Sequence, residues 1–326
     1  MIRFATENDI DKIMEFINLY WKEGHILATN KEFFKYEHLL EEGVSYVVSE
    51  AAGGEINAIL GYIPYGKSNR DIMTVMWKAN HTAEPSLGME LFDYLKDNAD
   101  VRLMASPGSN RKLMGLYKYL GYQFGKMVQW YRLNSQCTSY NIAIVENADV
   151  PQIAGNADYV EFETWCELEN AFDWDYYKAL NPKPYKEKWY VKKRYFDHPI
   201  YKYKVYGVKD ENQKTVLLLI FRKVEVNGSS VLRLLDCIGN MTYMSGISAM
   251  LDALMTQEKA EYVDCYEVGI SEEVMEAAGF LKVAKSGNII PNYFSPFVQE
   301  NIDIYYFSSD PEMILFKGDG DQDRPN

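Results

Sequence analysis

Two parts of this chain carry the same order of predicted elements, and this repeat constrains the fold more than any other feature. In each half a strand is followed by a helix, a strand, a second helix and a last strand. The spacing also agrees, because Gly88 and Tyr117 differ by 29 positions, as do Gly246 and Met275. A repeat of this kind predicts two related structural units in tandem.

Helical and strand-like patterns alternate along the chain, which indicates an α/β (α+β) fold. Apolar residues at three- and four-residue spacing predict a first helix, with Asn8 or Asp9 as its cap. An antiparallel meander of three strands follows, over residues 44–50, 56–64 and 71–77. Since 326 residues exceed one usual core, we expect two domains, 1–138 and 139–326. Each should be a mixed, mostly antiparallel central sheet flanked by helices.

Composition and charge exclude several classes of protein. The net charge of -13 makes nucleic acid a poor partner, because phosphate binding needs a basic surface. The four cysteines form no C-x-x-C pair, so no metal site is predicted and they should be core thiols. The chain begins without an apolar signal core and carries no run of about 18 apolar residues, so no membrane partner is expected. We therefore expect a cytoplasmic monomer or homodimer.

The segment Asn110-Arg-Lys-Leu-Met-Gly-Leu-Tyr-Lys-Tyr-Leu-Gly-Tyr122 carries the most specific pattern of the sequence. It predicts a helix over 111–120 and a strand over 122–133. With Gly88, it resembles the late motif of the GCN5-related N-acetyltransferase (GNAT) superfamily, an Asn, a helix with a Tyr, and Leu-Gly-Phe. In that family the fourth strand splays from the fifth, and the pantetheine arm of acetyl-coenzyme A pairs with strand backbone between them.

The resemblance implies a set of residues that bind acetyl-coenzyme A. Those at the end of the fourth strand, in the pyrophosphate loop and before the motif helix are Met76, Trp77, Lys78, Ser86, Leu87, Gly88, Met89 and Asn110. Backbone N–H groups at the start of a helix suit a pyrophosphate, and Ser86 to Gly88 retain them. The family's usual Arg is missing, and Glu84 and Pro85 stand nearby, one repelling phosphate and the other lacking an N–H.

Tyr117 occupies the position of the family's general acid, whose hydroxyl protonates the departing thiolate. The alternative is a core aromatic residue, because Tyr117 also belongs to an apolar stripe with Leu113, Leu116 and Leu120. Asn110 has two readings as well, a helix cap or a hydrogen-bond partner of pantetheine. His25 follows the first helix, in a segment that lines the acceptor site in the family, and it is the candidate base.

The second unit departs further from the family pattern. Met275 stands where the general-acid Tyr would be, so this unit is predicted to be non-catalytic. Many aromatic residues follow residue 160, and with acidic neighbours they suit either a sugar site or a core and domain interface. The tail from Lys317 to Asn326 has acids at alternate positions, Asp319, Asp321 and Asp323. A solvated tail is the favoured interpretation, ahead of a calcium loop or a tail that folds back to help line the acceptor pocket.

The sequence thus predicts an acetyl-coenzyme A dependent N-acetyltransferase without a metal. The acceptor is expected to be a small-molecule amine, with an amino sugar of surface-polysaccharide synthesis as the leading choice. Two alternatives stay open. One is a non-catalytic carbohydrate- or peptide-binding protein on a degenerate scaffold, and the other is an aminoacyl or peptide N-acyltransferase.

Overall fold

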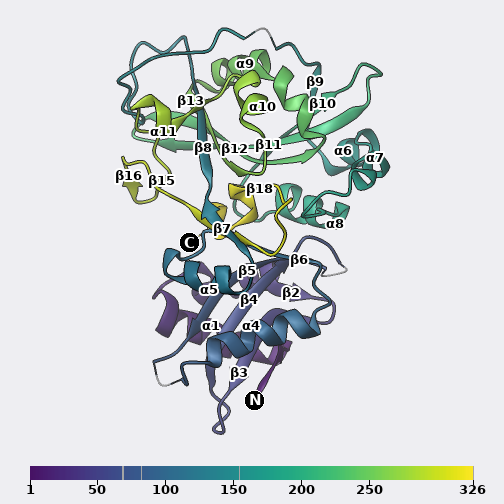
Figure 1. Cartoon of the computed structure of the whole chain (residues 1–326), viewed down its shortest axis with the longest axis vertical. Coiled ribbons are helices and arrows are strands. Elements are labelled where there is room, and N and C mark those ends of the chain that lie inside the picture. The colour runs from purple at the N-terminus through teal and green to yellow at the C-terminus, as the bar shows by residue number, and fades with distance from the viewer. Residues whose placement is uncertain (68–69, 82, 154, 326) are drawn as a thin grey trace. The chain divides into compact units, whose positions relative to one another are not determined.

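The computed structural model describes residues 1–67, 70–81, 83–153 and 155–325 and divides into two compact units. Unit 1 comprises Met1–Ser106 with the residues from Arg324 onward, and unit 2 comprises Pro107–Asp323. Each has its own central sheet, so the α/β class with two mixed sheets flanked by helices is confirmed (Figure 1). The repeat boundary at residue 138 stays a prediction.

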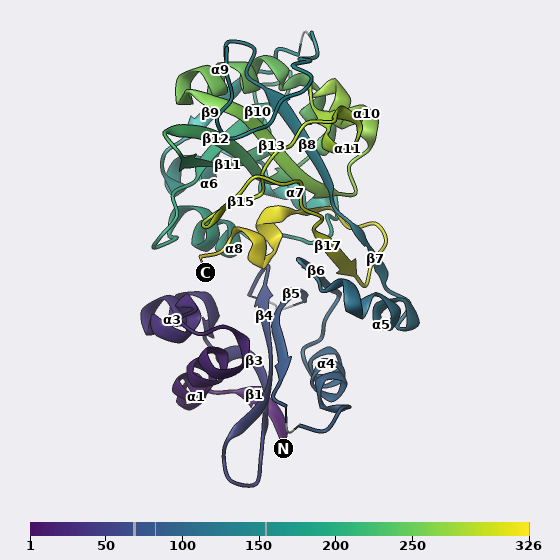
Figure 2. The same ribbon diagram turned by 90° about the vertical axis from the view of Figure 1, so that its left-hand side faces the viewer.

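Unit 1 is a sheet with helices on both faces. Its strands run in the order β1-β3-β4-β5-β6, all antiparallel except for the parallel pair β5 and β6, while β2 pairs with β3. The strands are β1 (Ile2–Ala5), β2 (Leu39–Leu40), β3 (Gly43–Glu50), β4 (Ile56–Pro64), β5 (Asp71–Ala79) and β6 (Leu103–Pro107). The helices are η1 (Glu7–Asp9), α1 (Ile10–Phe16), the π-helical η2 (Ile17–Trp21), α2 (Ile26–Thr29), α3 (Lys31–His38) and α4 (Leu87–Asn98). Figure 2 shows α1 and α3 on one face of the sheet and α4 on the other.

Local sequence explains where these helices begin and which face they bury. Thr6 is the N-cap at the start of η1, and the Asp9 carboxylate accepts from its backbone N–H at 2.8 Å, which completes a capping box. Asp9, one of the two predicted caps, is the N-cap position of α1, although its side chain makes no capping hydrogen bond to that helix. Helix α4 buries Leu87, Leu91 and Leu95, which recur every four residues and so lie on one face.

Unit 2 is built around a longer sheet in the order β14-β8-β13-β12-β11-β10-β9, in which only β12 and β13 are parallel. Its strands are β8 (Val128–Leu133), β9 (Tyr159–Phe162), β10 (Lys204–Lys209), β11 (Thr215–Val226), β12 (Ser229–Gly239), β13 (Ala260–Val268) and β14 (Leu281–Lys282), with β18 (Leu315–Phe316) paired to β13. Two further pairs are β7 (Gln123–Lys126) with β17 (Tyr305–Ser308), and β15 (Tyr293–Phe294) with β16 (Phe297–Val298).

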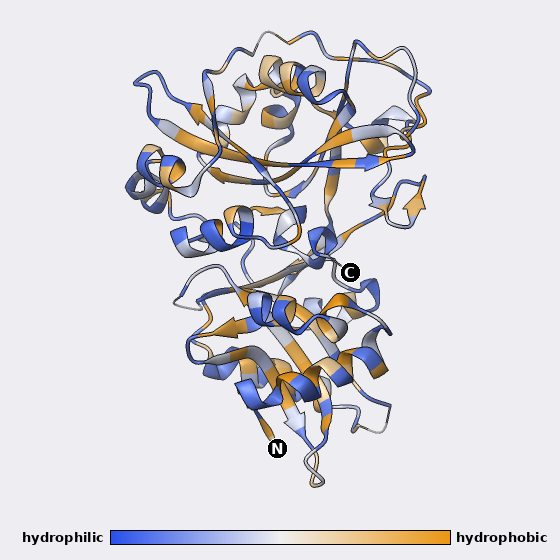
Figure 3. Cartoon of the chain, turned by 180° about the vertical axis from the view of Figure 1, so that it is seen from behind, coloured by the Kyte–Doolittle hydropathy of each residue, from blue (hydrophilic) through white to orange (hydrophobic). Residues whose placement is uncertain are grey.

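The helices of unit 2 lie beside this second sheet or, in the case of η3 and α5, beside β7. They are η3 (Arg111–Leu113), α5 (Met114–Tyr119), α6 (Trp165–Ala171), α7 (Trp174–Ala179), α8 (Lys188–Val191), the π-helical η4 (Lys192–Phe196), η5 (Met241–Gly246), α9 (Ser248–Glu258), α10 (Glu272–Ala277), α11 (Val283–Ser286), η6 (Lys317–Asp319) and η7 (Asp321–Asp323). The strands of both sheets are largely hydrophobic, whereas the helices mix both kinds of residue, as Figure 3 shows. Among the described residues, no helix is long and apolar enough to cross a membrane.

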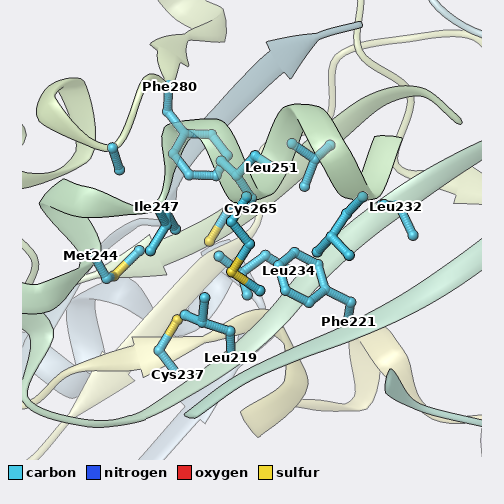
Figure 4. Packing of buried hydrophobic residues seen from close by; sticks show 14 of the residues in the cluster. Leu219, Phe221, Leu232, Leu234, Cys237, Met244, Ile247, Leu251, Cys265 and Phe280 are labelled. Carbon is cyan, nitrogen blue, oxygen red and sulfur yellow. The ribbon is translucent and has the colours of Figure 1, made fainter. Parts of the chain in front are cut away.

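The largest apolar contacts of unit 2 lie between its sheet and the helices α9 and α10. Leu234 of β12, Leu251 of α9 and Phe280 after α10 are each at most 1% exposed and meet in one cluster (Figure 4). Cys237 and Cys265 belong to it, which confirms these two as core thiols, although Cys166 is exposed.

Helices α5 and α10 end in the same way, which supports the predicted repeat. The N–H of Tyr122 donates to the Tyr117 carbonyl at 2.9 Å, and the N–H of Phe280 donates to the Met275 carbonyl at 3.1 Å. The residue that ends each helix is a glycine with positive φ, Gly121 (76°) and Gly279 (89°). This is the Schellman arrangement, which requires a left-handed residue that glycine adopts without strain.

The predicted strand over 122–133 is wrong, because the structure divides it between two sheets. Gln123–Lys126 pairs with β17, whereas Val128–Leu133 enters the sheet of unit 2 between β13 and β14. Alternating apolar residues predict a strand but do not identify its partner, which here lies more than 100 residues away in sequence.

The sequence had favoured a solvated C-terminal tail, and this prediction is also wrong. Asp319 and Asp323 are 0% and 1% exposed, and both pair with buried cations. Arg222 and Arg194 contact the Asp323 carboxylate at 2.5 and 3.1 Å. The tail therefore folds back on unit 2, because its acids neutralise charges that would otherwise be buried alone.

Candidate functional site

An irregular stretch of β5 is the first element of the candidate site in unit 1. Ile59 of β4 faces Lys78 and Gly61 faces Val75, so Leu60 has two residues opposite it, Met76 and Trp77. Met76 has φ of 46°, a conformation that non-glycine residues rarely adopt. A bulge of this kind bends a strand and often lies beside an active site. It falls on the strand end that the sequence predicted to bind acetyl-coenzyme A.

Strands β5 and β6 stay together only at their beginning. Their parallel pairing covers Asp71–Met73 and Leu103–Ala105, while β5 continues for six residues to Ala79. Its backbone from Thr74 onward therefore runs past the last position paired with β6. The divergence leaves strand N–H and C=O groups facing the β6 side, which is the edge that an extended ligand can join.

The start of α4 is fixed against this same stretch. The indole Nε1–H of Trp77 donates to the Gly88 carbonyl at 2.9 Å, and the Trp77 ring stacks on Phe92 with 5.2 Å between centroids. A Cβ on Gly88 would lie 3.4 Å from the indole nitrogen, so glycine allows this close approach. Two of the predicted binding residues are thus in direct contact.

The helix N-terminus carries acids as well as N–H groups. Ser86 precedes α4, and its hydroxyl donates to the Glu90 carboxylate at 2.7 Å. Leu87 is buried, whereas Gly88 and Met89 are partly exposed. The helix dipole favours an anion here, but Glu84 and Glu90 oppose it. Lys78, at the end of β5, is partly exposed.

The segment between α1 and α2 contains the candidate base. Its π-helical turn, η2, contacts β5 and leaves Leu19 and Trp21 61% and 44% exposed. His25 follows as the N-cap of α2, and its Nδ1 accepts from the Leu27 N–H at 3.1 Å. Burial lowers the pKa of His25 to about 4, so the ring is neutral at pH 7. Because Nδ1 accepts this hydrogen bond, the hydrogen of the neutral ring lies on Nε2. His25 can therefore act as a base only through Nδ1, after the hydrogen bond to the Leu27 N–H has broken.

Asn110 and Tyr117 lie in unit 2, around helix α5. The Asn110 side chain caps η3 by accepting from the Lys112 N–H at 3.0 Å. Tyr117 is 3% exposed, and its ring stacks on Phe307 with 4.0 Å between centroids. Burial raises the pKa of the Tyr117 hydroxyl well above its ordinary value. The hydroxyl therefore stays protonated near neutral pH, which is the form that a general acid needs.

The bulge in β5 was not predicted from the sequence, although the sequence contains one signal for it. Gly61 lies within the apolar run of β4, and a Cβ there would lie 2.9 Å from the Tyr46 ring and from Val75. A glycine inside a strand pattern marks a bulge or a close approach of the chain. In unit 2, Met275 is 0% exposed within the core, so its position is filled by an apolar side chain.

The comparisons with known proteins concern the fold. No protein-family model matches the sequence, and the curated proteins contain no match. A solved GCN5-related N-acetyltransferase from Anabaena variabilis matches with a TM-score of 0.58 and 12% identity, over 94% of this chain and 72% of that one. A probable N-acyltransferase from Enterococcus faecalis matches with a TM-score of 0.56 and 10% identity, over 96% and 73% of the two chains. The chain therefore has the fold of the GCN5-related N-acetyltransferases, with two such units in tandem.

Proposed function

We propose that this protein is an N-acyltransferase in which unit 1 binds acetyl-coenzyme A and the acetyl group passes to an amine. The observation that carries the proposal is the divergence of β5 from β6 beside the bulge at Met76 and Trp77. It leaves a strand edge that can pair with the amides of a pantetheine arm. The fold it shares with solved N-acetyltransferases supports the same reading.

The chemistry follows from a direct attack on the thioester. The amine nitrogen forms a bond to the acetyl carbon, and the bond between that carbon and sulfur breaks. Backbone N–H groups at the bulge of β5 polarise the carbonyl. Tyr117 supplies a proton to the leaving thiolate, and the nitrogen loses its surplus proton to water or to a base. His25 is the candidate for that base, provided that its bond to the Leu27 N–H opens.

The acceptor is proposed to be a small-molecule amine, with an amino sugar as the leading choice. The exposed Leu19 and Trp21 on η2 offer an apolar and aromatic surface against which a sugar ring can stack. Because η2 contacts β5, this surface belongs to the same unit as the bulge. An aminoacyl or peptide acceptor would use the same surface, so a panel of amines separates the two.

A second candidate function is supported by the charge at the start of α4. The missing Arg and the carboxylates of Glu84 and Glu90 disfavour a pyrophosphate, which fits a binding protein that has lost coenzyme A. Calorimetry with acetyl-coenzyme A decides between the two. We expect saturable binding below about 1 mM, equivalent to at least about 4 kcal/mol. No heat of binding at that concentration contradicts the enzyme and favours the binding protein.

A further inference from the structure

Unit 2 contains a gap between two parallel strands that corresponds to the divergence of β5 and β6 in unit 1. The pairing of β12 with β13 ends at Leu234 and Cys265, although β12 continues to Gly239 and β13 to Val268. On its far side β13 remains paired with β8 as far as Glu267. The two strands therefore separate toward their carboxyl ends, as β5 and β6 do.

The chain itself occupies this gap. Leu315 and Phe316, which form β18, pair antiparallel with Val268 and Glu267 of β13, where pairing with β12 has ended. On the other side, a Cβ added to Gly318 would lie 2.6 Å from the Leu235 carbonyl oxygen of β12. The segment thus touches both strands with its backbone, in the manner of an added strand.

Several contacts hold the segment from Met313 to Asp319 in place. Met313, Leu315 and Phe316 are at most 2% exposed, and Phe316 belongs to the same core cluster as Leu234. The N–H of Ile314 donates to the Lys183 carbonyl at 2.8 Å. Just after β13, a Cβ on Gly269 would lie 2.3 Å from the Met313 carbonyl oxygen. The fit is therefore close enough to require glycine at two positions, Gly269 just after β13 and Gly318 in the segment itself.

A buried ion-pair cluster closes the end of the segment. The Lys186 ammonium lies 2.7 Å from the Asp319 carboxylate and 2.5 Å from that of Asp236 on β12. The Tyr195 hydroxyl also donates to Asp236. Lys317 is buried too and donates to the Asn292 side chain at 2.5 Å. Withdrawing the segment would take the Asp319 carboxylate away from Lys186 and leave this buried ammonium with one of its two carboxylate partners, which is costly.

We propose that residues 313–319 are an internal ligand of unit 2, which fills its inter-strand gap and closes it to any acyl-coenzyme A. The chain consequently takes one acyl-coenzyme A, not two, and the sheet of unit 2 that holds this segment has a structural role. The part of this inference that concerns acyl-coenzyme A rests on the function proposed for unit 1. The occupied gap is independent of it. A cavity of about 310 Å³ remains beside Ile314, and its lining cations Lys183 and Lys186 are already ion-paired.

Hydrogen exchange followed by mass spectrometry tests the occupied gap without any ligand. In the full chain, amides of residues 314–318 should exchange as slowly as those of β13. Gly318→Val should speed their exchange at least tenfold, because the added atoms collide with the Leu235 carbonyl. Gly115→Val is the matched control, since nothing lies within 4 Å of its Cβ position. Fast exchange of these amides in the wild-type chain overturns the proposal.

Asp319→Asn provides a milder variant should Gly318→Val fail to fold. It weakens the pair with Lys186 and should speed exchange in the same peptide, whereas Asp321→Asn, at an exposed position of the tail, should not. Equal exchange rates in the Asp319 variant and in wild type contradict the closing role of the cluster.

The number of bound acetyl-coenzyme A molecules per chain tests the consequence. Calorimetry or equilibrium dialysis on the wild-type chain should give one. Two bound molecules per chain overturn the inference, because the second unit would then accept a ligand. If no acetyl-coenzyme A binds, the function proposed for unit 1 is contradicted. Slow exchange at residues 314–318 would still support the occupied gap in that case.

Discussion

Tyr117 combines a buried aromatic ring with the hydroxyl proposed as the general acid. Tyr117→Phe removes only the hydroxyl and keeps the stack on Phe307, so the free energy of unfolding should change by less than about 1 kcal/mol. Turnover of acetyl-coenzyme A should fall by about 100-fold or more, the usual contribution of a general acid. Tyr119→Phe, on the same helix but 88% exposed, is the control and should leave turnover unchanged. Equal turnover in wild type and Tyr117→Phe removes Tyr117 from the mechanism.

His25 should make the stability of the protein depend on pH. Its pKa falls from 6.5 to about 4 in the folded chain because of burial, so between these values the unfolded chain binds more protons. The stability is therefore complete above pH 6.5 and is lost as the pH falls toward 4. His25→Asn keeps a capping side chain but does not titrate, so its Tm should fall less between pH 6.5 and 4.5. His81→Asn, at an exposed loop position, should behave as wild type. An unchanged slope in His25→Asn excludes His25 as its source.

At the scale of elements, the paired strands β4 and β5 depend on a small residue beside the bulge. Gly61→Ala places a Cβ 2.9 Å from the Tyr46 ring and from Val75, so the sheet must shift. We expect a loss of about 1–3 kcal/mol in the free energy of unfolding, measured with urea. Gly53→Ala, in the turn before β4 where nothing lies within 4 Å, is the control and should change it by less than about 0.5 kcal/mol. Equal stability of both variants contradicts the close packing at the bulge.

Most elements could be predicted from the sequence, because each depends on a local pattern. The strand over 56–64 was predicted at its observed bounds, and the predicted helix over 111–120 is η3 followed by α5, within one residue. The strand over 122–133 failed since local alternation does not show that β7 and β8 have different partners. The contact of Trp77 with Gly88 agrees with the predicted site, but the bulge that places it depends on strand pairing that the sequence does not display.

For the molecule as a whole, the burial of the tail is the finding least visible in its sequence. Acids at alternate positions are typical of a solvated tail, and the cations that meet Asp319 and Asp323 lie more than 100 positions earlier, at Lys186, Arg194 and Arg222. Two units with one order of elements therefore differ in a decisive way. In the sheet of unit 2 the end of the chain joins β13, and in the second copy of the repeat the position that corresponds to Tyr117 is Met275, which has no hydroxyl.

Lys186 tests how far the stability of unit 2 depends on this burial. Lys186→Met leaves the carboxylates of Asp236 and Asp319 buried without their cation, which should cost about 3–5 kcal/mol in the free energy of unfolding. Lys188→Met is the control, because its pair with Glu169 is about half exposed, and it should cost less than about 1 kcal/mol. Adding Asp236→Asn to Lys186→Met removes one unpaired charge and should restore part of the loss. Chemical denaturation of the full-length variants measures all three. A loss below about 1 kcal/mol for Lys186→Met would show that water or movement of the tail already compensates these carboxylates, and would contradict a tail held in the sheet by this cluster.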